Sequence, residues 1–540
     1  MKKFLSVCAL GLSVAILAAC NQSGDPSSQS GATDIAVFAG GSSEFSWTAG
    51  TREAEVIDYI EQVYYEDTGT LLNFRVNTEL GKSMKQNIFT DVQNGNVDVV
   101  ISHTSGGDGI DDWAMDNDLY YDLYDYIDEY LYEYAEEELF TWEDGSLSLD
   151  GIQRLTTESE NVIGLPSVIS PYKFGILVRK DWMEACGYTD DPEDTSRTYV
   201  GDFQTFTAMA KAMKERYDLS HVITGAMFDV EKAGVLGAYG INAGYYTNTV
   251  YEENGTTYVG PGYIHPDYAD VLQLEYEWSR DGILSPDCDN ILLERGENNF
   301  IAGNTGIFLQ DPTVTHLIEV ARRTKQADPE AEFTVLGALT ATPDTTEKGF
   351  MRNSTATFAA VIPRNSKNAR EVIRFVRWMY SDVDNYLLCK YGREGVDWVY
   401  DRENNTYNWL DENGEVSDEG YINPPYSGIL TFVENQNMAN LTYAGYTEEE
   451  LSWIATAQDP ENYISNDTID YLLYLGNRDL NTIKGNQAVA IAQTIRPIWN
   501  GNTSYEGIVS QSFEAARTQY MTNAESYLVA MAELYNNFKN

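Results

Sequence analysis

The sequence predicts an α/β protein whose chain passes between two lobes. Apolar strands alternate with helical patterns over residues 34–101, and this order of elements gives a parallel sheet with covering helices. Two further apolar strands lie in line on either side of the polar segment Ser167–Tyr172, as expected where a chain crosses from one lobe to another. The 540 residues are enough for two or three domains with sizeable cores.

Apolar periodicity places the elements of the first sheet. The expected elements are strands at Asp34–Phe38, Leu71–Val76 and Val97–Ile101 and helices at Arg52–Tyr65 and over 80–94. Ligands of parallel sheets lie at the carboxyl ends of the strands. We therefore expect binding loops after the first and third strands, over residues 40–47 and 102–107.

The later part of the chain alternates strands, tight turns and helices. Asn254-Gly255 is a strong signal for a type I′ hairpin turn, and Asn404-Asn405 lies in a second hairpin. The other expected elements are strands ending at Pro166 and Leu309, strands at Phe174–Val178 and Phe358–Pro363, helices carrying Trp182 and spanning Asn368–Ser381, and mostly helices beyond Glu448.

The N-terminal segment has the pattern of a secretory signal. Lys2 and Lys3 precede an apolar run over residues 4–17 that is too short to span a membrane. The tetrapeptide Leu17-Ala18-Ala19-Cys20 resembles a bacterial lipobox, which implies that residues 1–19 are removed and that Cys20 is the lipid attachment site. Residues 20–33 are polar and rich in Ser and Gly, as in a flexible tether. The expected location is the extracellular face of the cell membrane; an ordinary signal with a chance cysteine is the alternative.

Composition limits the classes of partner. The formal net charge of −49 argues against nucleic acid and against a polybasic membrane surface, so we expect membrane contact only through the lipid. After Cys20 the cysteines are Cys186, Cys288 and Cys389, with no CxxC or Cys/His spacing, and the chain has 4 His. Two acid-rich loops fail the EF-hand pattern. We expect neither a metal nor a cofactor.

Five segments carry a resemblance to a known family. They are the lipobox at Cys20, the stretch over 95–101 (GNVDVVI), the crossing at Gly164–Trp182, the stretch over 303–307 before Gln310-Asp311, and residues 391–398 (YGREGVDW). Together they resemble family 1 of the extracellular solute-binding proteins, the maltose-binding-protein-like sugar-binding lipoproteins that serve ABC importers of Gram-positive bacteria. The resemblance covers nearly all of residues 34–540.

The resemblance implies an α/β, two-lobe periplasmic-binding-protein-like fold, a hinged trap, with extra C-terminal helices. Lobe 1 is expected over residues 34–167 plus 309–357, and lobe 2 over 170–306 plus 358–540. The crossings are then expected near Ser167–Tyr172, Ile307–Asp311 and Phe358–Pro363. The implied function is capture of a neutral sugar or oligosaccharide between closing lobes and its delivery to the permease subunits. We expect a monomer.

The candidate ligand-binding residues lie at strand ends, in the crossings and in the second-lobe region that resembles the family's cleft wall. They are Glu44, Trp47, His103, Thr104, Ser170, Tyr172, Phe228, Asp229, Tyr239, Gln310 and Asp311. Aromatic rings stack on sugar faces, and carboxylates and amides bind hydroxyl groups. Plain packing is the alternative for Trp47, and a structural role is the alternative for His103.

Two other function classes remain open. A secreted glycoside hydrolase needs only two carboxylates, and the chain has 84 Asp and Glu. However, the sequence shows no nucleophile elbow, HExxH motif or Ser/His/Asp constellation, so we expect no enzyme. The third class is an accessory protein that presents its ligand to a membrane sensor.

Overall fold

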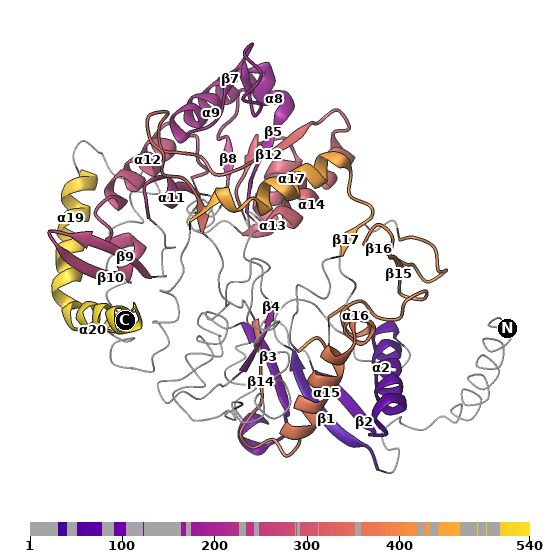
Figure 1. Ribbon diagram of the computed structural model, residues 1–540. Helices are drawn as coiled ribbons and strands as arrows, with labels where there is room; N and C mark the ends of the chain where they lie inside the picture. The colour runs from indigo at the N-terminus through magenta and orange to yellow at the C-terminus, as the bar shows by residue number, and fades with distance from the viewer. Residues whose placement is uncertain are drawn as a thin grey trace.

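The described residues of the computed structural model form two α/β bodies, each built on its own sheet (Figure 1). The structure describes residues 31–39, 51–77, 91–103, 164–168, 174–225, 234–241, 248–286, 292–310, 313–351, 358–417, 430–432, 441–464 and 508–539, with a few single residues between them. Among these residues, we find no helix with the length and apolar character that a membrane span requires.

The strands are β1 (Thr33–Ala39), β2 (Leu72–Asn77), β3 (Val99–His103), β4 (Gly164–Val168), β5 (Ile176–Arg179), β6 (Tyr188–Thr189), β7 (Thr198–Tyr199), β8 (Ile223–Thr224), β9 (Asn248–Glu253), β10 (Thr256–Pro261), β11 (Ile307–Phe308), β12 (Phe333–Leu336), β13 (Phe350–Met351), β14 (Phe358–Val361), β15 (Trp398–Asp401), β16 (Thr406–Trp409), β17 (Thr442–Tyr443) and β18 (Tyr463–Ile464). The helices are α2 (Arg52–Thr68), α8 (Lys180–Ala185), α9 (Phe203–Tyr217), α11 (Leu236–Ala238), η4 (Gly262–Ile264), α12 (Tyr268–Arg280), α13 (Leu293–Ile301), α14 (Val314–Ala327), α15 (Ala369–Ser381), α16 (Val383–Tyr391), α17 (Glu448–Gln458), η5 (Pro460–Asn462), α19 (Ile508–Asn523) and α20 (Glu525–Lys539).

The first body is a sheet in the order β2-β1-β3-β14-β4. Its strands β1, β2 and β3 are parallel, whereas β14 is antiparallel to both β3 and β4. The carboxyl ends of β1 to β4 therefore share one edge. Helices α2 and α15 lie side by side on the sheet, where the Tyr64 and Trp378 rings meet edge to face at 5.3 Å and Phe74 contacts Phe375 at 4.7 Å. Aromatic pairs of this geometry hold the two helices on one apolar core.

The second body is a sheet in the order β12-β5-β11-β8. Strand β5 is antiparallel to β11 and β12, and β11 is parallel to β8. Along β5, Ile176 and Val178 join the core under α9 and α12, while Leu177 joins the core under α13, α14 and α17. The strand is buried at every position because helices cover both faces of the sheet.

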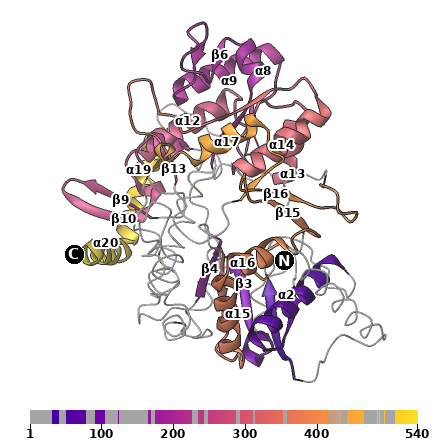
Figure 2. The same cartoon turned by 45° about the vertical axis from the view of Figure 1, so that its right-hand side comes forward.

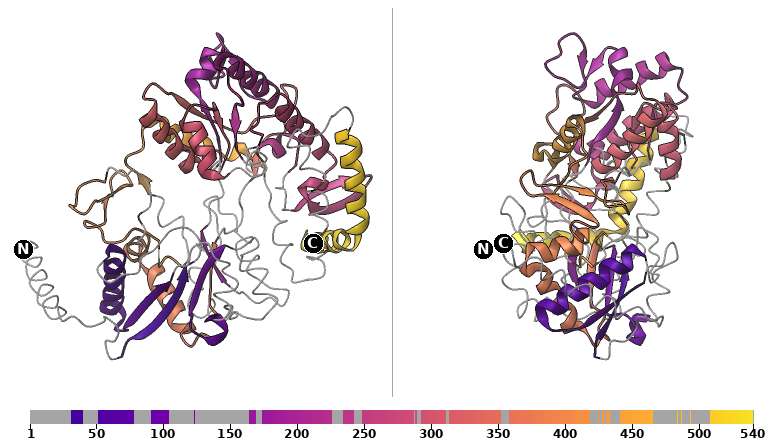
Figure 3. Two further views of the ribbon diagram at one scale, coloured as in Figure 1. Left: turned by 180° about the vertical axis from the view of Figure 1, so that it is seen from behind. Right: turned by 90° about the vertical axis from the view of Figure 1, so that its right-hand side faces the viewer.

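The C-terminal helices pack on the second body, which confirms the extra C-terminal helices predicted from the sequence. Helices α19 and α20 lie beside the hairpin β9–β10, as Figure 3 shows. Arg517 of α19 donates to Ile264 O over 2.6 Å and forms an ion pair with Glu253 at 2.6 Å. Asn254 and Gly255 have φ of 51° and 78°, as the predicted type I′ turn requires.

Both bodies contain chain segments that the sequence analysis assigned to the other lobe. The assignment of residues 309–357 to lobe 1 is wrong, because β12 pairs with β5 over four residues and α14 packs on the second sheet. The assignment of residues 358–540 to lobe 2 is wrong in part, because β14 inserts between β3 and β4 and carries α15, α16 and β15–β17 into the first body. From α17 onwards the described chain belongs to the second body.

The crossings follow from this topology. The first lies between β4 and β5, as predicted, and the second lies between β13 and β14, just before the predicted segment Phe358–Pro363. No crossing occurs at Ile307–Asp311, because β11 before it and α14 after it both belong to the second body. A third crossing, which the sequence analysis missed, lies between β17 and α17. The helix expected over 80–94 lies mostly outside the described residues.

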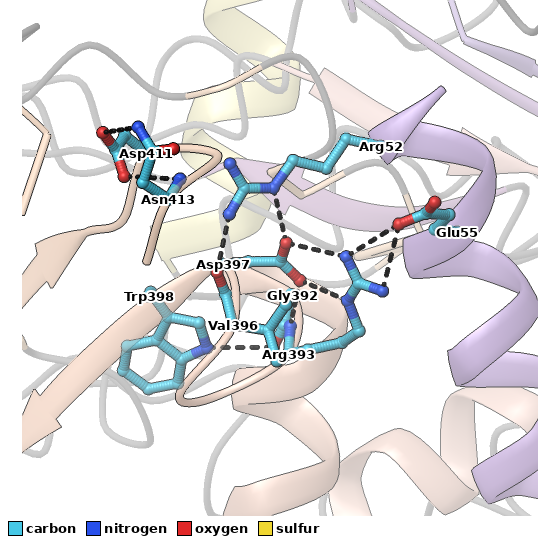
Figure 4. Close-up of polar contacts among 9 residues, drawn as sticks. All are labelled: Arg52, Glu55, Gly392, Arg393, Val396, Asp397, Trp398, Asp411 and Asn413. Carbon is cyan, nitrogen blue, oxygen red and sulfur yellow. Dashed lines mark hydrogen bonds and ion pairs between the residues drawn. The ribbon is translucent and has the colours of Figure 1, made fainter. Parts of the chain in front are cut away.

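A buried carboxylate fixes the start of α2 to the turn after α16 (Figure 4). The Asp397 side chain is 0% exposed and accepts hydrogen bonds from Arg52 Nε at 2.7 Å and from Arg393 Nε at 2.7 Å. Trp398 donates to Gly392 O at 2.9 Å within the same turn. Burial raises the pKa of Asp397, but the hydrogen bonds from Arg393 and Arg52 outweigh it, so the pKa lies below its ordinary value. Residues 391–398 thus have a structural role in the first body.

Glu61 lies between α2 and the first sheet. Its carboxylate accepts a hydrogen bond from the Phe74 backbone N–H at 2.5 Å. Burial raises the pKa of Glu61 to about 8, the Phe74 hydrogen bond lowers it, and the nearby Asp58 and Asp34 raise it further. The folded protein therefore holds a proton that the unfolded chain releases near pH 4.5, and stability falls between about pH 4.5 and 8.

Replacing Glu61 with Gln should remove this loss of stability, because the amide oxygen still accepts from Phe74 and cannot ionise. We expect Glu61→Gln to match the wild type near pH 4.5 and to be about 2–4 kcal/mol more stable above pH 8. Urea denaturation at the two pH values measures the difference. Glu66→Gln, an exposed change on the same helix, is the control and should follow the wild type at both values. A parallel pH dependence in all three proteins would contradict the prediction.

Candidate functional site

Both sheets direct the carboxyl ends of their parallel strands at the same chain crossing. Strand β4 leaves the first body at Val168, and the chain forms its first described contact in the second body at Phe174. Six residue steps span at most about 21 Å. In the second sheet, Ile176 pairs with Leu336 and Leu177 with Phe308, so the amino end of β5 lies beside the carboxyl ends of β11 and β12. Figure 1 shows β4 directed toward the second body.

These two strand edges form the candidate site. Ligands of open α/β sheets bind outside the carboxyl ends of the strands. The first edge consists of the ends of β1, β3 and β4, and the second consists of the ends of β8, β11 and β12. A ligand placed between the edges contacts both bodies and lies beside the crossings.

Tyr463 ties the first and second crossings to the second body. The Phe174 N–H, just after the first crossing, donates to Tyr463 Oη at 2.7 Å. The hydroxyl donates in turn to Ala457 O of α17 at 2.5 Å. Phe350, just before the second crossing, packs on the Tyr463 ring at 5.6 Å, and β13 pairs with β18. Tyr463 therefore attaches the second-body ends of the first and second crossings to α17, the helix that follows the third crossing.

The third crossing, over residues 444–447, is fully described. Tyr446 packs against the core of the first body and against the core of α14 and α17 in the second. Its ring meets Tyr443 of β17 edge to face at 5.4 Å. A Cβ on Gly445 would lie 2.5 Å from the Tyr443 ring, so only glycine permits this close approach.

Arg322 of α14 binds this crossing to the second body; helices α14 and α17 lie side by side in Figure 2. Its guanidinium donates to Gly445 O at 2.9 Å and to both carboxylate oxygens of Glu450 at 2.7 Å. It also lies 5.7 Å from the centre of the Tyr446 ring. Burial raises the pKa of Glu450, but the hydrogen bonds from Arg322 and Thr447 outweigh it and lower the pKa. Bidentate, charge-assisted pairs are the strongest polar contacts in proteins.

Most predicted site residues lie outside the described residues. These are Glu44, Trp47, Thr104, Ser170, Tyr172, Phe228, Asp229, Asp311 and the lipid attachment site Cys20. His103 is the last residue of β3, and its backbone pairs with Phe358 at the first strand edge. Its position at the strand end agrees with the prediction.

The two predicted residues whose side chains are described both pack within the second body. Gln310 is only 4% exposed and lies under α13, where a Cβ on Gly296 would lie 1.9 Å from its side-chain oxygen. Tyr239 is half-buried on the core of that body. Burial, with the charges of Asp270 and the other acids of α12, raises the pKa of Tyr239 to about 12. No described contact joins Gln310 to Tyr239.

Arg322, Tyr446 and Tyr463 are not among the residues predicted from the sequence. A signal was present for the third crossing: Thr447-x-x-Glu450 is a capping-box pattern, and the structure shows both of its hydrogen bonds. A helix start directly after Tyr443-Ala444-Gly445-Tyr446 indicates a short connection. Among the described residues, no group of three or more His, Cys, Asp or Glu is placed to hold a metal ion.

No family model matches the sequence, and no curated protein matches it. Solved structures do match it over nearly its whole length. The N-glycan transport solute-binding protein NgtS of Streptococcus pneumoniae is 14% identical, covers 94% of this chain and 98% of its own, and gives a TM-score of 0.60. An HMO-binding, ABC-transporter-associated solute-binding protein of Bifidobacterium longum infantis is 13% identical, covers 94% and 99%, and gives 0.59.

A third match is the ABC-transporter substrate-binding protein FusA of Streptococcus pneumoniae in complex with kestose. It is 14% identical, covers 94% of this chain and 99% of its own, and gives a TM-score of 0.58. These matches confirm the predicted fold class. The chain has the two-lobe fold of the solute-binding proteins of ABC transporters.

Proposed function

We propose that the chain is the substrate-binding component of an ABC importer and that it captures a neutral oligosaccharide between its two bodies for delivery to the permease subunits. The observation that carries the proposal is the convergence of two strand edges on one crossing. The names of the matching proteins also support the proposal, because they mention N-glycan transport, HMO binding and kestose.

The sequence around the edges favours a neutral ligand. Residues 40–47 (GGSSEFSW), 102–107 (SHTSGG) and 167–172 (SVISPY) contain no Lys or Arg. Phosphate and carboxylate ligands are held by arginine or by helix N-termini. Hydroxyl-rich ligands are held by aromatic faces and polar oxygens, which these loops supply in Trp47, Tyr172 and their serines. In this proposal the chain binds its ligand and catalyses no reaction.

A lipid at Cys20 places this function on the outer face of the cell membrane. Residues 20–33 connect Cys20 to β1, whose first residue, Thr33, already donates its N–H to Leu71 O at 2.9 Å. The first strand of the body therefore begins at the last residue of the polar segment. Acyl chains in this position keep the binding protein near the permease without a membrane-spanning helix.

Closure requires rotation within the crossings. The chain is held where each crossing enters the second body, by Tyr463 at the first two crossings and by Arg322 at the third. We therefore expect the first body to rotate relative to these held points. The ligand favours closure only if it contacts the closed state better than the open state.

A panel of neutral oligosaccharides should identify ligands through thermal shift. A ligand that binds only the folded state raises the melting temperature as its concentration exceeds Kd. For a ligand found this way, Trp47→Ala should weaken binding by about 0.5–1.5 kcal/mol beyond the lost buried area if the ring stacks on sugar. Tyr199→Ala, an exposed aromatic change on β7, is the control and should bind normally. The absence of any shift across the panel would contradict the proposed function.

Arg322→Gln should loosen the third crossing. The variant loses charge-assisted bonds to Gly445 O and Glu450, each worth about 1.5–3 kcal/mol. We expect amide hydrogen exchange over residues 445–451 to accelerate at least tenfold, as about 1.4 kcal/mol suffices for that factor. Arg323→Gln, which removes an ion pair to Glu297 away from the crossing, is the control. Equal acceleration in both variants would show that Arg322 has no special role in the hinge.

A further inference from the structure

We propose that α15 and the turn before it dock on an anionic phospholipid surface through an exposed row of basic side chains, and that this contact holds the first body against the membrane. The row consists of Arg364, Lys367, Arg370, Arg374 and Arg377, and we call it the basic stripe. The inference rests on the proposed lipid anchor at Cys20. It departs from the expectation, drawn from the net charge of the chain, that only the lipid contacts the membrane, because it adds a second contact through the protein itself.

The basic stripe runs along one face of α15 and onto the turn before it. Arg370, Arg374 and Arg377 follow the spacing of three and four residues that puts side chains in line along a helix, whereas Arg364 and Lys367 lie in the turn that precedes α15. All five residues of the stripe are exposed. The opposite face of α15, which includes Ile373, Phe375 and Met379, is buried in the core of the first body. The helix lies on the outside of the sheet in Figures 1 and 2.

The stripe stands out against the charge of the whole chain. The chain has 35 Lys and Arg against 84 Asp and Glu, yet residues 364–377 contain five basic residues and one acid, Glu371, a local charge of 5 − 1 = +4. Glu371 is half-buried. Among the ion pairs of the described residues, none involves Lys367, Arg370 or Arg377. At physiological salt the Debye length is about 8 Å, so distant acidic residues do not cancel the field of the stripe.

Three acids of the described residues that contact α15 or the turn before it are already engaged. Asp34 forms an ion pair with Arg75 at 3.1 Å, and Asp67 at the end of α2 accepts a hydrogen bond from Trp378 Nε1 at 2.8 Å. Asp98 is buried, where it accepts from Ser366 at 2.6 Å. Each Lys or Arg side chain near an anionic membrane is attracted to the lipid headgroups, and added salt weakens this attraction.

The tether enters the body beside the stripe. Asn368, the residue before α15, donates to the backbone oxygen of Asp34, the second residue of β1, at 2.9 Å. Cys20 and Thr33 are 13 residues apart, and a chain of that length spans at most about 45 Å. Lipid at Cys20 therefore keeps this end of α15 within reach of the headgroups. Proximity to the tether favours a lipid surface over an acidic protein as the occupant.

The test uses the processed, acylated full chain in vesicles of phosphatidylcholine alone and in vesicles that also contain phosphatidylglycerol. A membrane-impermeant amine reagent reports the labelling rate of Lys367 by mass spectrometry, and Lys211 on α9 of the second body is the internal reference. We expect Lys367 to be labelled at least five times more slowly on the anionic vesicles, and high salt to restore the rate. Lys211 should react at the same rate throughout.

Arg370→Gln/Arg377→Gln should abolish the protection of Lys367, whereas Arg216→Gln/Arg280→Gln on the second body should leave it intact. Flotation with the vesicles tests the anchor separately. A chain that fails to float rejects the anchor at Cys20 and the docking with it. A chain that floats with Lys367 labelled equally on both vesicles overturns the docking alone. If Lys367 is protected from labelling in native membranes but not on anionic vesicles, the stripe binds an acidic protein instead of lipid, and the proposal is also overturned.

Discussion

The insertion of β14 between β3 and β4 determines how the two bodies of this protein are related. Its four residues pair with both neighbours, although all four strands of the second sheet separate them from β4 in the sequence. The first sheet is complete only after the chain has left for the second body and returned. Neither body is a continuous stretch of chain, because the chain passes from one to the other between β4 and β5, between β13 and β14, and between β17 and α17. This arrangement permits a hinge and prevents the bodies from separating.

The contacts at the crossings explain how such a hinge keeps its geometry. Tyr463 joins the Phe174 N–H to Ala457 O, and Arg322 holds Gly445 and Glu450 on α14. Both residues act on the second-body side, so the crossings enter that body at fixed positions. Tyr446 touches both cores. Because the strand edges meet at these crossings, a ligand between them acts directly on the segments that turn.

The local sequence pattern predicted most helices and strands correctly, but it did not predict which of the two bodies each one joins. The strands β1, β2 and β4, the helices α2 and α15, and the hairpin turn at Asn254-Gly255 follow the sequence signals closely. The lobe boundaries were wrong because apolar periodicity shows that a strand is buried without showing which sheet it joins. Strands β12 and β14 are both short apolar runs, yet β12 pairs with β5 and β14 with β3.

The candidate site was predicted only in outline. The strand ends mark its position, and His103 lies at one of them. Gln310 follows β11 at the second edge, but Gly296 lets α13 approach closely enough to bury it, and no local pattern reveals that packing. Arg322 and Tyr463 carry no motif at all, since their roles depend on contacts with residues more than 120 and 280 positions away.

Small-angle scattering with and without a saturating oligosaccharide tests the central claim most directly. If the ligand binds between the two strand edges and closes the bodies about the crossings, the radius of gyration must fall on binding. The decrease should follow the same saturation curve as the thermal shift. Tight binding with an unchanged radius of gyration would contradict the account, because the ligand would then lie on one body alone and the crossings would not act as a hinge.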